Sequence, residues 1–158
     1  MIPGQEQPTA TTALQVGTPA PSREFGPLTR QMFVRYAGAS GDLNPMHYDD
    51  EFARSAGHPS VFAQGMFSAA LLAGFATDWL GAGSVRRFGV RFREQVWPGD
   101  VLTCSGSVTA LTTGPDGDRV SLELTATRQT GGVAIAGTAE FLITQNAAGR
   151  DAAGADGP

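Results

Sequence analysis

The sequence has no lysine and only one cysteine, Cys104, among its 158 residues. A lone cysteine excludes a disulfide within the chain and any metal site built from paired cysteines. It also argues against a disulfide-stapled secreted scaffold, so we expect a cytoplasmic protein. All 11 basic residues are arginines, and with 15 acidic residues the formal net charge is −4. This mild acidity is not typical of a nucleic-acid binder, which normally carries a basic stripe.

No segment of the sequence is apolar enough over a sufficient length to suggest a membrane span. The most apolar stretch, residues 66–80, is shorter than the ~20 residues that a span needs, and Asp78 interrupts it. Residues 1–12 are polar and lack the basic start and apolar run of a signal peptide. We therefore expect no membrane insertion. Metal-binding spacings such as H-E-x-x-H are also missing, so we expect no metal.

The two ends of the chain differ in composition from its middle. Residues 1–17 are rich in Gln, Thr, Pro and Gly, and residues 145–158 are mostly Ala, Gly and Asp without an aromatic side chain. Segments with so little to bury are typical of flexible tails. We therefore expect one domain over residues 18–144, a common size for a single domain.

The first half of that domain predicts a helix followed by a long irregular segment. The helix is expected over residues 30–39, with Thr29 as its N-cap and Gly41 just after its end. Residues 40–60 contain Gly, Asp, Asn, Pro and both histidines, which indicates a loop with one helical turn at 50–55. Loops of this length inside a compact domain are usually functional.

A second helix is predicted over residues 63–80, and its sequence is apolar on nearly every side. A helix without a polar face is normally buried, so we expect this one at the centre of the domain. Gly65 and Gly74 weaken its helix propensity. We interpret both glycines as places of close packing against another backbone.

After residue 83 the hydrophobic period changes to two, which predicts half-buried antiparallel strands. Four such stretches cover residues 88–92, 102–109, 120–125 and 133–141. Turn sequences rich in Gly, Pro and Asp, at 98–100, 114–117 and 131–132, separate these four stretches, and a short first strand is expected at 25–28. The expected fold class is α+β, with a long central helix wrapped by a curved antiparallel sheet that contains a four-stranded meander.

The densest polar cluster is the run Asp42-Leu43-Asn44-Pro45-Met46-His47 in the long loop. Asp42 and His47 are a common general acid–base pair, because their pKa values can be set on either side of neutrality. Pro45 fixes one φ angle and stiffens the loop, and Asn44 can hold the loop or a water through its amide. A structural interpretation is also open, in which Asp42 caps a turn and His47 satisfies a carbonyl.

A second candidate site is the start of the apolar helix, at Gln64-Gly65-Met66. A helix N-terminus presents unpaired N–H groups and partial positive charge, and a glycine lets a ligand approach the backbone closely. Gly65 would suit an oxyanion hole, although packing alone would also explain it.

Three segments resemble the MaoC-like family of hot-dog proteins. The run from Tyr36 to His47 contains D-x-N-P-x-H, similar to the (R)-specific hydratase motif of that family. Phe62-Ala63-Gln64-Gly65-Met66 is similar to its A-H-G-M at the start of the central helix, with Gln64 in place of the usual histidine. Val90-Arg91-Phe92 and Pro98-Gly99-Asp100 resemble its first long strand and turn. The resemblance covers nearly the whole predicted domain and is especially close to the B subunit of mycobacterial (3R)-hydroxyacyl-ACP dehydratase.

The resemblance implies a hot-dog fold and reversible hydration of trans-2-enoyl thioesters to (3R)-hydroxyacyl thioesters, with no cofactor. By matching positions, Asp42 and His47 would bind and activate the water, and in dehydration would abstract the α proton and assist loss of the β-hydroxyl. The N–H of Gly65 would bind the thioester oxygen as enolate character develops, and Asn44 would order the loop. The implied partners are a coenzyme A or acyl-carrier-protein thioester and, in a homodimer or heterodimer, another hot-dog chain.

Two other functions stay open at this point. One is a non-catalytic acyl-binding or partner subunit, which the intact Asp42 and His47 disfavour. The other is a hot-dog thioesterase, which usually carries an acidic residue near the start of its central helix, whereas residues 63–67 contain none. The acyl pocket is expected to depend on the packing of four large side chains on that helix, Phe67, Leu71, Phe75 and Trp79. A basic patch formed by Arg86, Arg87, Arg91 and Arg93 is either a solvated strand face or a place for the carrier's phosphates.

Overall fold

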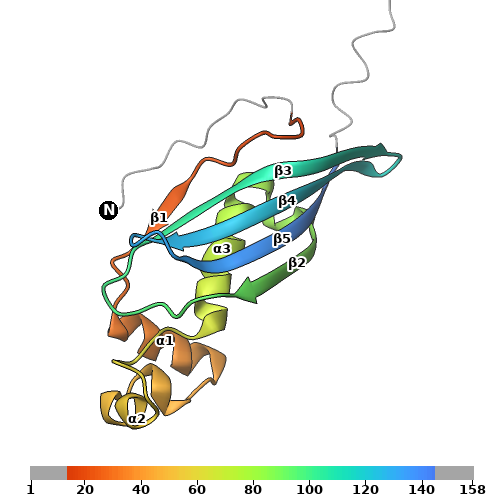
Figure 1. The fold of residues 1–158 in the computed structure, drawn as a ribbon. Helices are drawn as coiled ribbons and strands as arrows, with labels where there is room; N and C mark the ends of the chain where they lie inside the picture. The colour runs from red at the N-terminus through yellow and green to blue at the C-terminus, as the bar shows by residue number, and fades with distance from the viewer. Residues whose placement is uncertain (1–13, 145–158) are drawn as a thin grey trace, which may run out of the picture.

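Five antiparallel strands form one sheet in a computed structural model of the protein, which describes residues 14–144 (Figure 1). In chain order they are β1 (Arg23–Phe25), β2 (Val85–Phe92), β3 (Leu102–Gly114), β4 (Gly117–Arg128) and β5 (Val133–Ile143). Across the sheet their order is β1-β3-β4-β5-β2. The strands from β3 to β5 are joined by tight turns at the predicted places, so this part of the predicted meander is confirmed.

The position of β2 differs from the predicted four-stranded meander. β2 pairs with β5, with Phe92 opposite Ile135, and not with β3, which follows it in the chain. Residues 93–101 therefore cross one end of the sheet. The prediction was wrong here because a period-two pattern identifies a strand and its buried face but not its partner. β2 consequently forms one edge of the sheet.

The first strand also lies earlier than predicted, at Arg23–Phe25 instead of 25–28. It pairs with β3, and Phe25 lies opposite Leu102. Pro27 has no N–H to donate to a neighbouring strand, so the pairing ends before it. β1 thus forms the other edge of the sheet.

The short helices agree with the sequence pattern. α1 covers Arg30–Ser40, the hydroxyl of Thr29 accepts a hydrogen bond from the N–H of Met32, and Gly41 ends the helix with a left-handed φ of 75°. The predicted turn at 50–55 is α2 (Asp50–Ser55). A 3₁₀ turn, η1, covers Pro45–His47, and a second one, η2, covers Ala82–Ser84. Figure 1 shows α1 and α2 beyond one end of the sheet.

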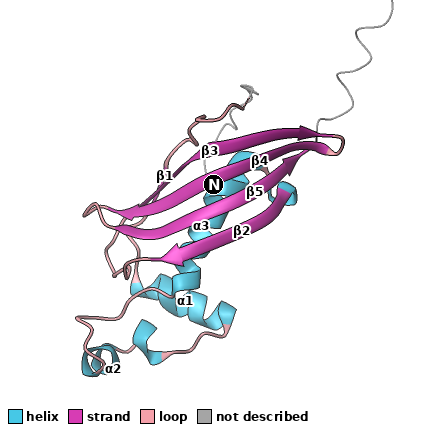
Figure 2. Cartoon of the chain, turned by 45° about the vertical axis from the view of Figure 1, so that its right-hand side comes forward, coloured by secondary structure: helices cyan, strands magenta, loops and turns pink. Residues whose placement is uncertain are grey.

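The long helix α3 (Gly65–Leu80) crosses one face of the sheet, which curves over it (Figure 2). Its buried side includes Leu72 and Phe75, which join one apolar cluster with the inward residues of β3, β4 and β5. The inward side chains alternate along each strand, as at Leu122 and Leu124 of β4. A hot-dog architecture, with a single helix inside a curved antiparallel sheet, is therefore confirmed.

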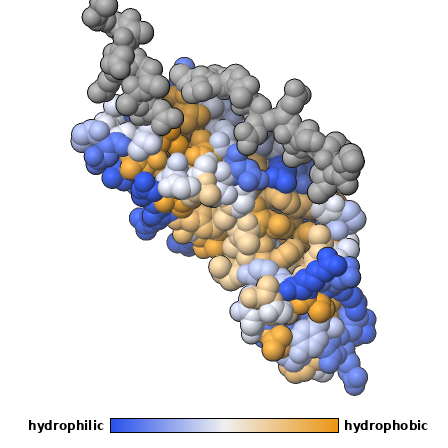
Figure 3. Space-filling view, turned by 180° about the vertical axis from the view of Figure 1, so that it is seen from behind, coloured by the Kyte–Doolittle hydropathy of each residue, from blue (hydrophilic) through white to orange (hydrophobic). Residues whose placement is uncertain are grey.

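One face of α3 is not covered, so the prediction that this helix is buried all round was wrong. Met66 is 60% exposed, Ala70 is also exposed, and a Cβ placed on Gly74 would meet nothing within 4 Å. A Cβ on Gly65 would meet the ring of Phe92, not another backbone. The physical reason is that a single sheet can cover only one side of a helix. Seen from behind, this side of the molecule shows an extended apolar surface (Figure 3).

The ends of the predicted domain stay a prediction. Residues 1–13 and 145–158 lie outside the described residues, and they include most of the two predicted tails. Within the described part, the N–H of Gly17 donates to the carbonyl of Val108 on β3. No helix between residues 14 and 144 is long and apolar enough to cross a membrane. Cys104 is fully buried in the core, and burial raises the pKa of its thiol to about 12.

Candidate active site

The end of α1 places Asp42. The hydroxyl of Ser40, in the last turn of the helix, donates to the carbonyl of Tyr36 at 2.8 Å. The same hydroxyl accepts a hydrogen bond from the N–H of Asp42 at 3.2 Å. Because Gly41 turns the chain with a positive φ, Asp42 leaves the helix and starts the irregular segment.

The next five residues form a tight turn that brings His47 back toward Asp42. The side-chain oxygen of Asn44 accepts from the N–H of Met46 at 3.1 Å and so caps the turn η1, in which Pro45 is the first residue. The hydroxyl of Tyr48 donates to the carbonyl of Leu43 at 3.1 Å and closes the loop from the other side. The predicted ordering role of Asn44 has a clear geometric basis in this cap.

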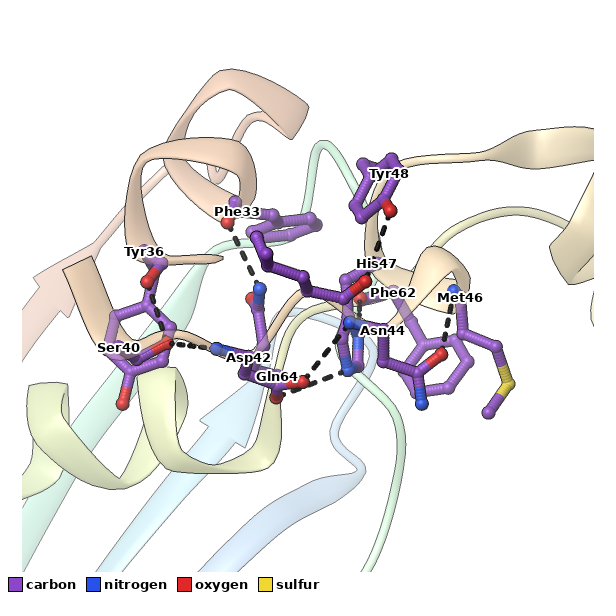
Figure 4. A network of polar contacts seen from close by, with 11 residues as sticks. Phe33, Tyr36, Ser40, Asp42, Asn44, Met46, His47, Tyr48, Phe62 and Gln64 are labelled. Atoms are coloured by element: carbon purple, nitrogen blue, oxygen red, sulfur yellow. Dashed lines mark hydrogen bonds and ion pairs between the residues drawn. The ribbon is translucent and has the colours of Figure 1, made fainter. Parts of the chain in front are cut away.

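Asp42 and His47 face each other across this turn (Figure 4). Oδ2 of Asp42 lies 3.7 Å from Nε2 of His47. The other carboxylate oxygen of Asp42 accepts from the N–H of Asn44 at 3.4 Å. Nδ1 of His47 lies 2.8 Å from the carbonyl oxygen of Phe62, which can only accept, so Nδ1 carries a proton.

Both structural roles considered for this pair are therefore present, but each uses only one polar atom. Asp42 caps a turn with Oδ1, and His47 satisfies a carbonyl with Nδ1. Oδ2 and Nε2 remain directed at each other, and in the neutral imidazole Nε2 is the basic nitrogen. The side chain of His47 is 10% exposed and that of Asp42 is 47% exposed, so a water at the pair is in reach of both. This arrangement can exchange protons with a bound molecule.

Gly65 begins α3, and its N–H donates to no group in the described part of the chain. Gln64 precedes it and is 1% exposed, which places its amide inside the protein. Its Nε2 donates to the carbonyl of Phe33 in α1 at 3.1 Å, while its Oε1 has no partner among the described residues. Gln64 thus ties the start of α3 to α1. The N–H of Gly65 has no partner within the helix because it lies in the first turn, so it is available to a ligand.

A cavity of about 190 Å³ adjoins Gly65. Its walls come from the segment before α3, the first turn of α3, the end of β2 with the following loop, and β5. The residues are Phe62, Ala63, Gly65, Ser68, Phe92, Arg93, Glu94, Gln95, Val96 and Ile135. None of the four large α3 side chains predicted to shape an acyl pocket is among them. Of the α3 residues, only Gly65 and Ser68, both at the start of the helix, line this cavity.

Phe62 connects the cavity with the acid–base pair. Neither Asp42 nor His47 lines the cavity, whereas Phe62 does. The ring of Phe62 meets the imidazole of His47 edge-on, with centroids 5.2 Å apart. Sequence reasoning did not assign a role to Phe62, although it stands in the same motif as Gly65. It also found no reason to assign a role to Ser68, which is buried one turn after Gly65 and lines the cavity.

The described residues show no group of three or more His, Cys, Asp and Glu side chains that could hold a metal ion. His58, the second histidine, packs its ring against Phe62 with centroids 4.8 Å apart. The backbone N–H of His58 donates to the carbonyl of Ala53 in α2. It lies on the same aromatic residue as His47 but has no carboxylate partner in the structure described for residues 14–144.

Replacing Gly65 by alanine is expected to lower turnover without unfolding the protein. The new Cβ would lie 3.0–3.3 Å from three ring atoms of Phe92, so the methyl would intrude on the cavity. Phe92 is 53% exposed, so its ring can move outward, and the helical backbone accepts alanine readily. Thermal unfolding and thioester assays of the variant should show an unchanged or higher Tm and a reduced kcat/KM.

Gly38→Ala provides the matched control for this substitution. Gly38 lies inside α1, and a Cβ there would meet nothing within 4 Å. The exchange should stabilise the helix by roughly 0.5–1 kcal/mol and leave kcat/KM unchanged. Equal activity of the Gly65→Ala protein and the wild type would contradict the expectation that a ligand occupies the cavity where the new methyl group would lie.

Fold and candidate site together define a hot-dog protein in which Asp42 and His47 meet in the segment that precedes the central helix α3. The chain belongs to the MaoC-like domain family, since the sequence model described as "MaoC like domain" matches residues 10–130. The resemblance found in the sequence motifs is thereby confirmed.

Curated relatives support this membership. The (R)-specific enoyl-CoA hydratase of Aeromonas caviae is 33% identical over 134 residues, which are 83% of this chain and 95% of that protein. The fatty acid synthase subunit beta of Saccharomyces cerevisiae is 36% identical over 73 residues, which are 44% of this chain and 4% of the relative. The chain therefore spans only a small part of the length of the fungal relatives that it matches.

Solved structures share the fold. The (R)-hydratase from A. caviae involved in PHA biosynthesis superposes with a TM-score of 0.74 at 28% identity, covering 84% of this chain and 98% of that one. The HadBC (3R-hydroxyacyl-ACP dehydratase) complex from Mycobacterium tuberculosis gives a TM-score of 0.64 at 18% identity, covering 77% and 90% of the chains. At that identity the second match concerns the fold alone.

Proposed function

We propose that this protein catalyses the reversible hydration of trans-2-enoyl thioesters to (3R)-hydroxyacyl thioesters, as a hydro-lyase. The observation that carries the proposal is the pairing of Asp42 Oδ2 with His47 Nε2 at 3.7 Å, with His47 bonded to Phe62, which lines the same cavity as Gly65. Full-length similarity to the (R)-specific enoyl-CoA hydratase of A. caviae supports the same reaction.

The geometry suggests how the atoms move. A water held between Asp42 and His47 attacks the β carbon of the enoyl group, and Nε2 of His47 takes the proton that the water loses. Negative charge develops on the thioester oxygen, where the N–H of Gly65 stabilises it at the positive end of α3. Return of the proton to the α carbon completes the hydroxyacyl product. In dehydration the same pair removes the α proton and protonates the departing hydroxyl.

We further propose that the protein acts as a dimer with itself or with another hot-dog chain. The uncovered apolar face of α3 and the free edge of β2 support this. A second chain can bury the apolar face and pair with the backbone groups of the strand edge. Ala70 lies in the middle of that face, so Ala70→Glu should convert the assembly to monomers in sedimentation analysis. A wild-type chain that sediments as a monomer would contradict this part of the proposal.

The basic patch supports a phosphate-bearing carrier on the substrate. Arg86, Arg87, Arg91 and Arg93 are all exposed, and none forms an ion pair within the described part of the chain. Arg93 also lines the cavity beside Gly65, so a carrier chain leaving the cavity would pass it. Guanidinium groups bind phosphates well, and coenzyme A and acyl-carrier protein both bring them.

The deciding experiment follows the enoyl absorbance of short and medium trans-2-enoyl-CoAs mixed with the purified chain, with chiral analysis of the product. Loss of absorbance without release of thiol, and a (3R)-hydroxyacyl product, are expected. Comparison with acyl-carrier-protein thioesters identifies the carrier. Release of thiol would indicate a thioesterase instead, and tight binding of enoyl-CoA without turnover would indicate a non-catalytic partner subunit.

A further inference from the structure

The imidazole of His47 contacts Phe62 in two different ways. Nδ1 of His47 donates to the carbonyl of Phe62 at 2.8 Å, and the two rings meet edge-on at an interplanar angle of 84° (Figure 4). The N–H of Phe62 also donates to the carbonyl of Met46 at 3.4 Å, one residue before His47. The orientation of the imidazole, and hence the direction of Nε2, depends on where Phe62 lies.

Phe62 is held in turn by the loop that crosses the end of the sheet. Its ring packs edge-on against Trp97, with centroids 5.8 Å apart. The N–H of the next residue, Ala63, donates to the carbonyl of Val96 at 2.8 Å. Two successive residues of the segment before α3 are thus fastened to two successive residues of the crossing loop.

Asp100 fixes the position of Trp97 within that loop. Its Oδ2 accepts from the N–H of Trp97 at 2.8 Å and from Nε of Arg128 at 2.8 Å. Its Oδ1 accepts from Arg128 at 3.2 Å and from the side-chain amide of Gln129 at 2.8 Å. Asp100 is 4% exposed, so these bonds act in a mostly dry environment at the end of β4.

We infer that Trp97, anchored by Asp100, is a positioning residue for His47 and acts through Phe62. The inference deepens the proposed function, because the position of Nε2 matters only if the imidazole moves protons. Neither Trp97 nor Asp100 touches the acid–base pair. They set its geometry through a continuous series of contacts: carboxylate to backbone N–H, indole to phenyl ring, and phenyl ring with its carbonyl to imidazole.

The chain allows a direct test, because it contains only two histidines. Nitrogen-15 labelling of histidine in an untagged protein yields two imidazoles, which His47→Asn assigns. In its neutral form, His47 should hold its proton on Nδ1, which faces the carbonyl oxygen of Phe62. Asp42 is the charged group that faces this ring, and His58, whose ring also packs against Phe62, gives a second, separate signal.

Trp97→Ala is expected to give His47 a mixture of proton positions and to lower kcat by up to about 10²-fold, as for a misplaced catalytic group, with little change in KM. Trp97→Phe keeps an aromatic edge against Phe62 and should restore both the nitrogen signature and kcat. Phe62→Leu removes the ring but keeps the carbonyl, and should reproduce the Trp97→Ala effect by a second route.

Val120→Ala is the matched control for general destabilisation. Val120 is fully buried on β4, eight residues before Arg128, and touches none of the contacts described above. It should lower Tm without altering the His47 signature. The inference is overturned if Trp97→Ala leaves the proton of His47 on Nδ1 and kcat unchanged, or if Val120→Ala changes both as strongly. The nitrogen signature decides this even if the chain hydrates no thioester, so the two proposals fail separately.

Discussion

Exchange of His47 for asparagine is expected to lower kcat/KM by about 10²–10⁴-fold, the range for loss of a general acid–base group. The asparagine amide can occupy nearly the position of Nδ1 and still donate to the carbonyl of Phe62, so the loop should keep its shape. The substitution therefore removes Nε2 alone. Steady-state kinetics with an enoyl thioester, together with an unchanged Tm, would measure this loss.

His58→Asn is the control, because the ring of His58 also packs against Phe62 but has no carboxylate partner in the described residues. It should leave kcat/KM near the wild-type value. Asp42→Asn should cause a loss comparable to that of His47→Asn, since the amide keeps the bond from the N–H of Asn44 but not the negative charge. If the pair works as a unit, the double variant loses no more than either single one. Full activity of His47→Asn would refute the mechanism.

Much of the local structure could be predicted because each feature depends on a few neighbouring residues. The Thr29 cap, the Gly41 stop and the turn at 50–55 all appear in the structure at the predicted places. The meeting of Asp42 with His47 also rests largely on local contacts, since Gly41, the Asn44 cap and the bond from Tyr48 to Leu43 all lie within this short segment. Residues close in sequence carry their own geometric constraints.

The remaining features depend on contacts between distant segments, which periodicity does not specify. The pairing of β2 with β5 and the open face of α3 both result from how one sheet meets one helix. The hold of Phe62 on His47 joins residues 15 apart, and that of Trp97 on Phe62 joins residues 35 apart. Gln64 is a further example. The sequence shows that a glutamine replaces the usual histidine of the motif, but only the structure shows that its amide donates to the carbonyl of Phe33.

Asp100→Ala is expected to destabilise the protein by about 3 kcal/mol, the lower end of the usual cost of removing one partner of a buried ion pair, because Arg128 keeps its second partner, Glu94, at 3.4 Å. Three groups lose an acceptor at once: the guanidinium of Arg128, the amide of Gln129 and the N–H of Trp97. Asp78→Ala is the control, because its ion pair with Arg23 is exposed and should contribute at most about 1 kcal/mol. Urea unfolding of the three proteins would compare them, and equal losses in both variants would contradict the buried role of Asp100.

The same carboxylate should make stability depend on pH in a defined direction. Burial raises the pKa of Asp100, but hydrogen bonds from Arg128, the N–H of Trp97 and Gln129 outweigh it, so the pKa lies below the ordinary 3.8. A group whose folded pKa is depressed stabilises the fold above its unfolded pKa and loses that contribution as pH falls through the folded value. When the pH is lowered past about 4, the urea concentration at the unfolding midpoint of the wild type should therefore decrease. Asp100→Asn should remove part of this decrease. Because the Asp100 network also holds Trp97, protonation that loosens the network should release Phe62 and His47 before the sheet itself unfolds.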